Sequence, residues 1–142
     1  MIGSNVAQFP AQKHVGDRDW GEEIMAAVIP QVLTLKILNI KKGHQGGLQY
    51  HRLKQEAGVL ISGKLLIRFE NEHGELEERV VNSGESFFFP NGSVHQEVAL
   101  EDCKIIEAST PYLNDRVRVE ADFGFDSDGG LPTTSLDEIK HL

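Results

Sequence analysis

Short apolar segments separated by turn residues make up most of the chain from residue 32 onward. Each segment is rich in β-branched or aromatic residues and is bounded by glycine, asparagine or acidic residues, a pattern typical of an antiparallel all-β domain. Glycine and asparagine between the segments tolerate the positive φ that tight turns require. So many strands within residues 32–109 predict a sandwich or a barrel. The predicted strands read VLTLKILNIK, GVLIS, KLLIRFE, ELEERVV, SFFFP, HQEVAL and CKIIEAS.

The two ends of the chain carry weaker signals. Residues 22–29, EEIMAAVI, fit either a short helix or another strand, and the closing SLDEIKHL predicts one helical turn capped by Ser135. We therefore expect an N-terminal arm over residues 1–30, a barrel core over residues 31–110 and a C-terminal extension over residues 111–142 that wraps the barrel. A chain of 142 residues fits one domain with one core.

The charge balance narrows the choice of partners. The chain has 14 Lys and Arg residues against 22 Asp and Glu residues, a formal net charge of -8, which repels nucleic acids and anionic lipid surfaces. Its apolar runs are far shorter than the roughly 18 residues of a membrane helix. The single Cys103 cannot form an intrachain disulfide, and the first twenty residues lack the order of a signal peptide. We expect a cytoplasmic protein that binds a small molecule.

Residues 43–63, GHQGGLQYHRLKQEAGVLISG, contain candidate metal ligands. Residues two apart on a strand face the same side, so Gln49 and His51 would project together, and Glu56 could return to the same point beyond a bend. His95 opens another predicted strand. These nitrogen and oxygen donors suit a first-row divalent ion (manganese, iron, cobalt, nickel or zinc) and would leave positions open for substrate or water. The alternative is that they are polar residues on a half-exposed strand.

Two spaced motifs favour the metal site. Residues 43–63 read G-x5-Q-x-H-x4-E-x6-G, and residues 84–95 read G-x5-P-x-G-x2-H. Both resemble the two motifs of the cupin superfamily, with Gln49 where most members have a first histidine. The LQYH setting is similar to the cupin domain of type II mannose-6-phosphate isomerases. Further resemblances to that subgroup are DWGEE, LKILNIKKG and NDRVRVEADFG, so the likeness covers residues 19–124.

The resemblance implies a single-domain cupin β-barrel, or jelly roll, in which Gln49, His51, Glu56 and His95 hold one divalent metal. It implies a sugar or sugar-phosphate isomerase or epimerase, and a homodimer formed through outer strands and exchanged N-terminal arms. An iron-dependent cupin dioxygenase and a non-catalytic sugar-binding or sensor cupin are the alternatives. Three departures leave the phosphate grip and the proton-transfer machinery open: Asp19 in place of proline, few histidines in HRLKQE, and Phe125 in place of arginine.

An aldose–ketose isomerase needs a Lewis acid and a base that moves a proton between carbons. Candidates for the base are Lys36, Glu56 if it leaves the metal, and His44. Lys36 matches a lysine of the resembled isomerases, and a partly buried lysine can serve as a base, although a surface position on an edge strand fits equally well. For substrate binding we predict Arg118, whose planar fork suits phosphate or carboxylate, and His44. An ion pair of Arg118 with a neighbouring acid is the alternative.

Several other residues are expected to be structural. We expect Tyr50 and Cys103 to pack, Trp20 to anchor the N-terminal arm, and His73 to lie in a solvated turn. The aromatic residues 87–89 should face both sides of one strand, in the core or at a dimer surface.

Overall fold

The structure, a computed structural model, describes residues 2–126 and 133–142. These residues form thirteen strands and two short 3-10 helices, which confirms the all-β prediction. Among them, no helix has the length and apolar character needed to cross a membrane. The elements are β1 (Lys13–Arg18), β2 (Gly21–Ile29), β3 (Leu33–Ile40), β4 (Gln49–His51), β5 (Glu56–Ser62), β6 (Lys64–Glu70), β7 (Leu76–Asn82), β8 (Ser86–Phe89), β9 (His95–Ala99), β10 (Cys103–Ser109), β11 (Tyr112–Leu113), β12 (Arg116–Arg118), η1 (Ala121–Phe123), η2 (Leu136–Glu138) and β13 (Lys140–His141).

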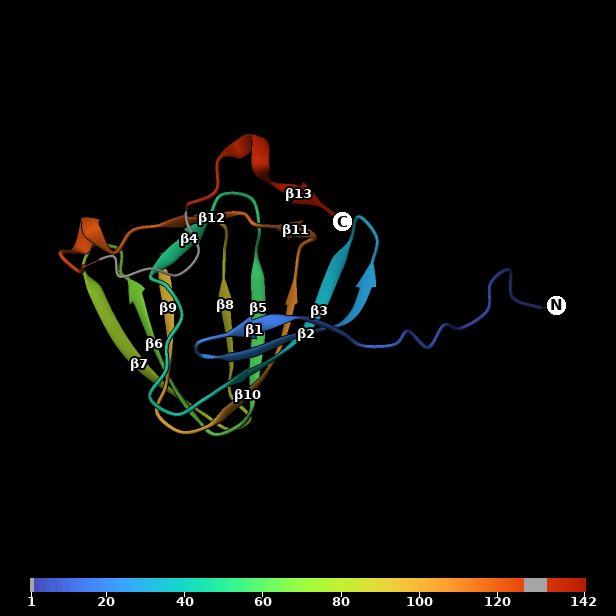
Figure 1. Ribbon diagram of the computed structural model, residues 1–142, viewed down its shortest axis with the longest axis horizontal. Coiled ribbons are helices and arrows are strands. Elements are labelled where there is room, and N and C mark those ends of the chain that lie inside the picture. Colours follow the sequence, from blue (N-terminus) through green and yellow to red (C-terminus); the bar gives the residue numbers. More distant parts are fainter. Residues whose placement is uncertain (1, 127–132) are drawn as a thin grey trace.

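Two antiparallel sheets face each other and enclose the core (Figure 1). One has six strands in the order β1-β2-β3-β10-β5-β8, and the other has five in the order β12-β4-β9-β6-β7. Strands distant in the sequence are neighbours, as in the pairing of β10 with both β3 and β5. This is the arrangement of a jelly roll, as the sequence predicts.

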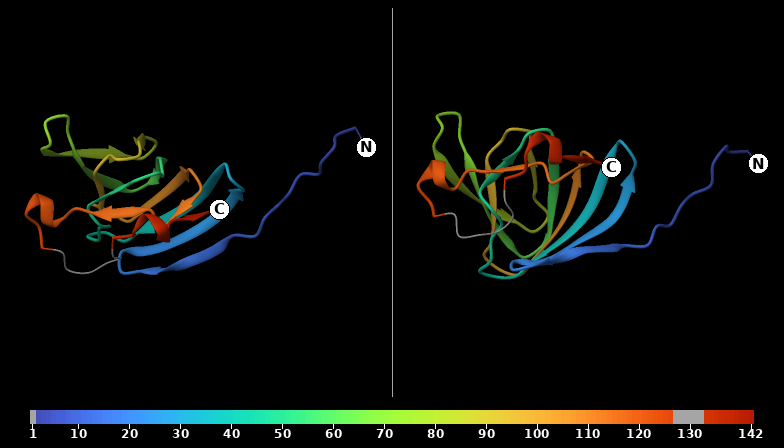
Figure 2. Two further views of the ribbon diagram at one scale, coloured as in Figure 1. Left: turned by 90° about the horizontal axis from the view of Figure 1, so that it is seen from above. Right: turned by 45° about the horizontal axis from the view of Figure 1, so that its top comes forward.

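All seven predicted strands form, as β3 and β5 to β10, and residues 22–29 resolve as a strand within β2. β1 and β2 pair as a hairpin that continues the sheet beyond β3, so only residues 2–12 extend away from the barrel (Figure 2). Gly21 permits this approach, because a Cβ at that position would lie 1.8 Å from the carbonyl oxygen of Asn39. Trp20, expected as an anchor, packs against the core.

The barrel interior is apolar at one level and polar at another. On β3, β5 and β10 alternate residues are buried, and the deeper rows contain residues such as Leu38, Leu60 and Ile105. Cys103 packs there as expected. Closer to the end of the barrel that the C-terminal segments cross, the inward-facing positions of the same strands are instead buried polar side chains. These are Thr34, Lys36, Glu56, Glu107 and Ser109.

The aromatic run of β8 divides between the two faces of the sheet as predicted. Phe87 and Phe89 point inward and Phe88 is exposed. Gly58 on the neighbouring β5 is required by this packing, because a Cβ there would lie 2.4 Å from the tip of the Phe87 ring. The sheet therefore closes over an aromatic side chain directly below the row that contains Glu56.

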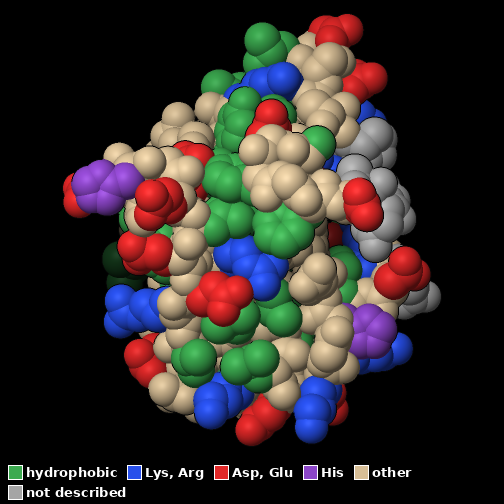
Figure 3. Space-filling model, turned by 90° about the vertical axis from the view of Figure 1, so that its left-hand side faces the viewer, with side chains coloured by type: hydrophobic (Ala, Val, Ile, Leu, Met, Phe, Trp, Pro, Cys, Tyr) green, Lys and Arg blue, Asp and Glu red, His purple; other side chains and the backbone are tan. Residues whose placement is uncertain are grey.

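A smaller apolar cluster covers the outer side of the five-stranded sheet. It is built on Leu48, Val94 and Val119, and Tyr50 packs against it as expected. In the view of Figure 3, hydrophobic side chains run down the middle of this side of the molecule, interrupted by adjacent basic and acidic groups. Because these residues alternate with inward-facing ones, the cluster fixes which side chains of β4, β9 and β12 enter the barrel.

The C-terminal segments lie across one end of the barrel (Figure 1). β12 pairs with β4, β13 pairs with β11, and the Thr134 N–H donates to the Arg116 carbonyl at 2.9 Å. The helical turn expected after Ser135 forms as η2, where the Ser135 N–H donates to the Glu138 carboxylate at 3.1 Å.

Candidate metal centre

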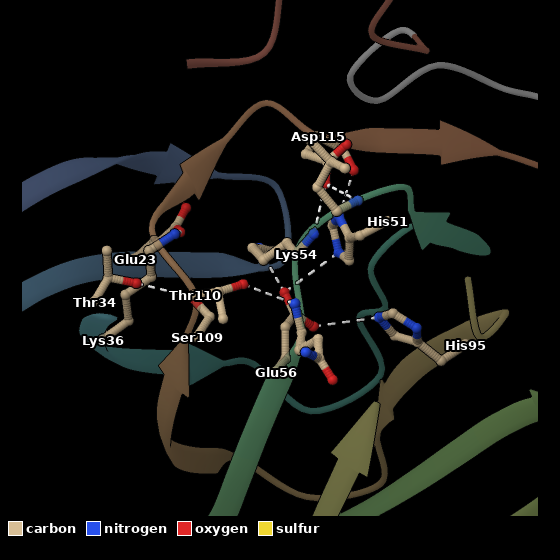
Figure 4. A network of polar contacts seen from close by, with 12 residues as sticks. Glu23, Thr34, Lys36, His51, Lys54, Glu56, His95, Ser109, Thr110 and Asp115 are labelled. Carbon is tan, nitrogen blue, oxygen red and sulfur yellow. Dashed lines mark hydrogen bonds and ion pairs between the residues drawn. The ribbon is translucent and has the colours of Figure 1, made fainter. Parts of the chain in front are cut away.

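Three of the predicted ligands converge inside this end of the barrel (Figure 4). His51 ends β4, Glu56 begins β5 and His95 begins β9, so each lies where a strand meets a turn. The Nε2 atoms of His51 and His95 lie 3.3 and 3.4 Å from the two oxygens of Glu56. All three residues are buried, and their donor atoms lie within 4.8 Å of one another.

Both imidazoles are oriented by backbone carbonyl groups. His51 Nδ1 lies 2.8 Å from the Asp115 carbonyl oxygen, and His95 Nδ1 lies 3.0 Å from the Ser93 carbonyl oxygen. A carbonyl oxygen only accepts, so each Nδ1 donates, and the neutral form of each ring would present its Nε2 lone pair to the cluster. Metal-binding histidines have the same outer partners. The Phe89 ring also stacks on His95 at 3.9 Å, which holds the second imidazole in place.

The fourth predicted ligand, Gln49, lies beside this cluster. It is paired with His95 on one neighbouring strand and with Arg118 on the other, on the face of β4 that carries His51. Its side-chain oxygen passes close to Gly47, 3.2 Å from where a Cβ would be. Two aligned imidazole nitrogens, a carboxylate and a nearby amide fit a first-row divalent metal.

Lys54 reaches the same carboxylate from a bend. Its Nζ lies 2.5 Å from Glu56 Oε1 in a buried ion pair. Burial alone would lower the pKa of Lys54, but the carboxylates of Glu56 and Glu107 outweigh burial and raise it. Burial alone would raise the pKa of Glu56, but the Lys54 ammonium beside it holds that pKa well below its ordinary value. The carboxylate is therefore ionised and able to bind a cation.

Asp115 holds the bend that carries Lys54. Its buried carboxylate accepts the backbone N–H groups of Leu53 at 2.6 Å, Lys54 at 2.7 Å and Arg52 at 3.3 Å. Its own carbonyl orients His51. Asp115 thus positions the predicted ligand His51. It also positions Lys54, the cation that pairs with the predicted ligand Glu56.

Lys36, a predicted base, is buried inside the barrel rather than exposed on an edge. Its Nζ lies 2.7 Å from Glu23 Oε1, and Arg18 pairs with the other oxygen of Glu23 at 3.3 Å. Glu107 lies between Lys36 and the β5 strand that carries Glu56, since it is paired with Lys36 on β3 and with Gly58 on β5. Lys36 is thus separated from the cluster by an acidic neighbour.

Two carboxyl groups near the cluster hold their protons unusually tightly. Burial and the nearby Glu56 raise the pKa of Glu107 to about 8. Burial, followed by Glu107 and Glu56, raises the pKa of Glu97 well above its ordinary value. In the metal-free protein Glu107 therefore holds a proton near neutral pH close to the ionised Glu56, an arrangement suited to proton exchange.

The two predicted substrate-binding residues occupy different places. Arg118 shares the inner face with Gln49, and its guanidinium pairs with Glu120 through Nε at 2.9 Å, the ion pair foreseen as the alternative. The structure does not bring His44 to the cluster. The His44 carbonyl accepts the N–H of Ala99, at the far end of β9 from His95.

Lys54, Glu107, Asp115 and Arg116 are polar residues of this region that the sequence reading did not select. A usable signal existed for Glu107, which follows Cys103 and Ile105 at alternate positions on a buried strand face. A charge within such a series indicates an interior polar site. The positions of Lys54, Asp115 and Arg116 result from contacts between β12 and the segment around β4, which are more than 60 residues apart in the sequence. Motif spacing alone does not predict such contacts.

No protein-family model matches this sequence, and no curated protein matches it significantly. Solved structures do resemble it. The capsular polysaccharide assembling protein CapF from Staphylococcus aureus has a TM-score of 0.61 at 24% identity, over 70% of this chain and 30% of its own. KdgF from Halomonas sp. has a TM-score of 0.58 at 21% identity, over 69% of this chain and 87% of its own. An RmlC-like cupin from Shewanella frigidimarina has a TM-score of 0.59 at 18% identity, over 70% and 83%.

These similarities show a shared fold. The activity has to be inferred from the residues of this chain. The chain spans under a third of CapF, whose remaining length has no counterpart here.

Proposed function

We propose that this chain, which has the cupin fold, binds one divalent transition metal through His51, Glu56, His95 and Gln49. We propose that the metal-bound protein is a sugar or sugar-phosphate isomerase or epimerase. The observation that carries the proposal is the pair of imidazoles, oriented through Nδ1, whose Nε2 atoms face the two oxygens of one ionised carboxylate. Such an arrangement of buried donors is costly without a cation to bind them.

A bound metal would polarise the carbonyl and hydroxyl oxygens of the sugar. The chain must then supply the groups that move the proton between adjacent carbons. Our candidates for the base are Glu56, if it leaves the metal, and Lys36, which would act through Glu107 because Glu107 lies between Lys36 and the strand of Glu56. Lys54 holds Glu56 in position, and Phe89 covers one face of the His95 ring. Removing the base should slow proton transfer by roughly 10²- to 10⁴-fold.

The substrate class is supported by two observations of different kind. The LQYH setting of Gln49 resembles the cupin domain of type II mannose-6-phosphate isomerases. CapF, among the structures with a similar fold, assembles a capsular polysaccharide. We therefore place the substrate of this chain among sugars and sugar phosphates.

The metal assignment is tested by elemental analysis of purified protein. We expect about one equivalent of a first-row metal in the wild type, and loss of most of it in His51→Ala and in His95→Ala. His73→Ala, in an exposed turn, is the matched control and should retain the metal. Full occupancy in both ligand variants would overturn the assignment.

The reaction class is tested by incubating the metal-loaded protein with aldose and ketose phosphates in deuterated water. Isomerase chemistry predicts deuterium at the carbon next to the carbonyl, without oxygen consumption. Oxygen uptake by the iron-loaded protein would instead identify a dioxygenase. Sugar binding in calorimetry with no deuterium exchange would identify a sensor.

We further propose that the protein is a homodimer. Leu35, Ala57, Val59, Phe88 and Ile106 line an apolar groove of about 550 Å³ on the outer face of the six-stranded sheet. The arm of residues 2–12 carries exposed apolar side chains such as Phe9 and runs away from its own barrel (Figure 2). A second copy could cover the groove with this arm. Light scattering should give twice the chain mass for the wild type and one chain mass for Phe88→Ser, and a monomeric wild type would refute the proposal.

A further inference from the structure

Basic side chains gather in the polar network around the metal centre and on the strand next to it. Five of them are Arg18, Lys36, Lys54, Arg116 and Arg118, whereas Arg52, in the bend that Asp115 holds, donates to the Thr134 carbonyl. Four have a carboxylate partner: Glu23 pairs with Arg18 and Lys36, Glu56 with Lys54, and Glu120 with Arg118. Within residues 2–126 and 133–142, no carboxylate pairs with Arg116.

Arg116 lies on the face of the sheet that carries the metal ligand His51. In the pairing of β12 with β4 it lies directly opposite His51, and opposite residues of an antiparallel pair project from the same face of the sheet. Such partners have Cα atoms about 5 Å apart, so the Arg116 side chain starts beside the His51 ligand. It extends from the strand that lies across the end of the barrel.

The Arg116 guanidinium is poorly satisfied. Its Nε is buried without a hydrogen-bond partner, and it is the one buried side-chain nitrogen or oxygen in this condition among the described residues. Burial lowers the pKa of Arg116, and the like charges of Arg18 and Arg118 lower it further, whereas the more distant Glu23 carboxylate, which is paired with Arg18 and Lys36, raises it. A partly buried cation with an unused donor, placed among other cations, is a binding position for an anion.

The negative net charge of the protein makes the unpaired Arg116 significant for substrate binding. With a formal net charge of -8, the protein repels anions in general, so an anionic substrate needs a local cationic site. A guanidinium matches both phosphate and carboxylate, because its N–H groups form a planar fork.

We propose that Arg116 binds the anionic group, a phosphate or a carboxylate, of the substrate whose oxygens meet the metal centre. This inference rests on the proposed function and specifies its substrate class as an acidic sugar derivative. Arg118 cannot serve this purpose in the same way, since its fork is engaged by Glu120. The anion and the reacting oxygens must belong to one small molecule, because Arg116 and His51 are cross-strand neighbours.

Calorimetry with three matched probes tests the proposal: mannose, mannose 6-phosphate and mannuronate, which differ at carbon 6. Wild type should bind one or both anionic probes at least tenfold more tightly than mannose. Arg116→Met should remove that preference and leave the affinity for mannose unchanged. Arg116→Lys should retain part of it, because it keeps the charge but loses the fork. Arg79→Met, an equal change of charge at an exposed site on β7, is the control and should behave as wild type.

Thermal melting separates a binding role from a structural one. Arg116→Met should melt at the same temperature as wild type or higher, because it removes an unpaired cation. Inorganic phosphate should raise the melting temperature of wild type and not of Arg116→Met.

The outcomes distinguish this inference from the proposed function. Equal affinities of wild type and Arg116→Met for both anionic probes would overturn the inference, even if isomerase activity is present. Equal weakening in Arg79→Met would also overturn it, since it would indicate general electrostatics. Loss of metal and turnover in His51→Ala would support the proposed metal-dependent function. Retention of phosphate binding in the same variant would support the separate role of Arg116.

Discussion

Replacing Asp115 by alanine should be among the most damaging single changes in this protein. Its carboxylate is buried at 2% exposure and accepts three consecutive backbone N–H groups, from Arg52, Leu53 and Lys54. Alanine would leave these donors unsatisfied inside the protein. The bend that carries Lys54 to Glu56 would then lose all three hydrogen bonds that the Asp115 carboxylate makes to its backbone.

The size of the effect follows from the distances. The bonds at 2.6 and 2.7 Å are short and involve a charged acceptor, for which about 1.5–3 kcal/mol each is typical, whereas the third at 3.3 Å is weak. We expect a loss of about 3–5 kcal/mol of unfolding free energy. For a chain of 142 residues, an unfolding entropy of about 0.3 kcal/mol/K converts this loss into a melting temperature lower by about 10–17 °C.

Differential scanning calorimetry of the metal-free protein measures this shift, and elemental analysis measures the metal. Asp115→Ala should also bind metal more weakly, because the Asp115 carbonyl orients His51. Asp122→Ala, an exposed acid in η1, should change the melting temperature by less than about 2 °C. A shift below about 3 °C in Asp115→Ala would refute the reasoning, since the three hydrogen bonds would then contribute almost nothing.

Two further predictions concern the barrel interior. The folded protein keeps a proton on Glu107, with a pKa of about 8, that the unfolded chain loses above its ordinary pKa of 4.5, so metal-free wild type should lose stability as the pH rises from 5 to 8. Glu107→Gln should flatten this decline in melting temperature, and an unchanged slope would contradict the assignment. Gly58→Ala should destabilise the protein by about 1–3 kcal/mol in urea unfolding, because the new methyl group meets the Phe87 ring. Adding Phe87→Leu should recover part of that loss, and strictly additive losses would indicate that the ring is not the obstacle.

The predictable part of the site is the part encoded by local spacing. Gln49, His51 and Glu56 share one stretch of chain, and the turn before His95 places it at the start of a strand, so two motifs were enough to predict that His51, Glu56 and His95 lie together. The strands were equally accessible, because each alternates buried and exposed residues between turn residues. These features need no knowledge of the tertiary arrangement.

The surroundings of the cluster were not predictable for a physical reason. Lys54 meets Glu56 because Asp115, 61 residues further along the chain, folds the bend between them. Arg116 lies on the face of the sheet that carries His51 because the register of β12 on β4 places the two residues opposite each other. Both depend on how the C-terminal segment docks, and neither contact leaves a periodic signal in the sequence.

The contact between His51 and the Asp115 carbonyl also has a consequence for biosynthesis. The two residues are 64 positions apart, and at typical elongation rates of about 5–20 residues per second the first leaves the ribosome several seconds before the second. During that interval the His51 ring lacks the acceptor that directs its Nε2 toward Glu56. Metal should therefore be acquired after β12 has docked, as a late step in maturation. A nascent chain that stalls before residue 115 would present loose ligands instead of a finished centre.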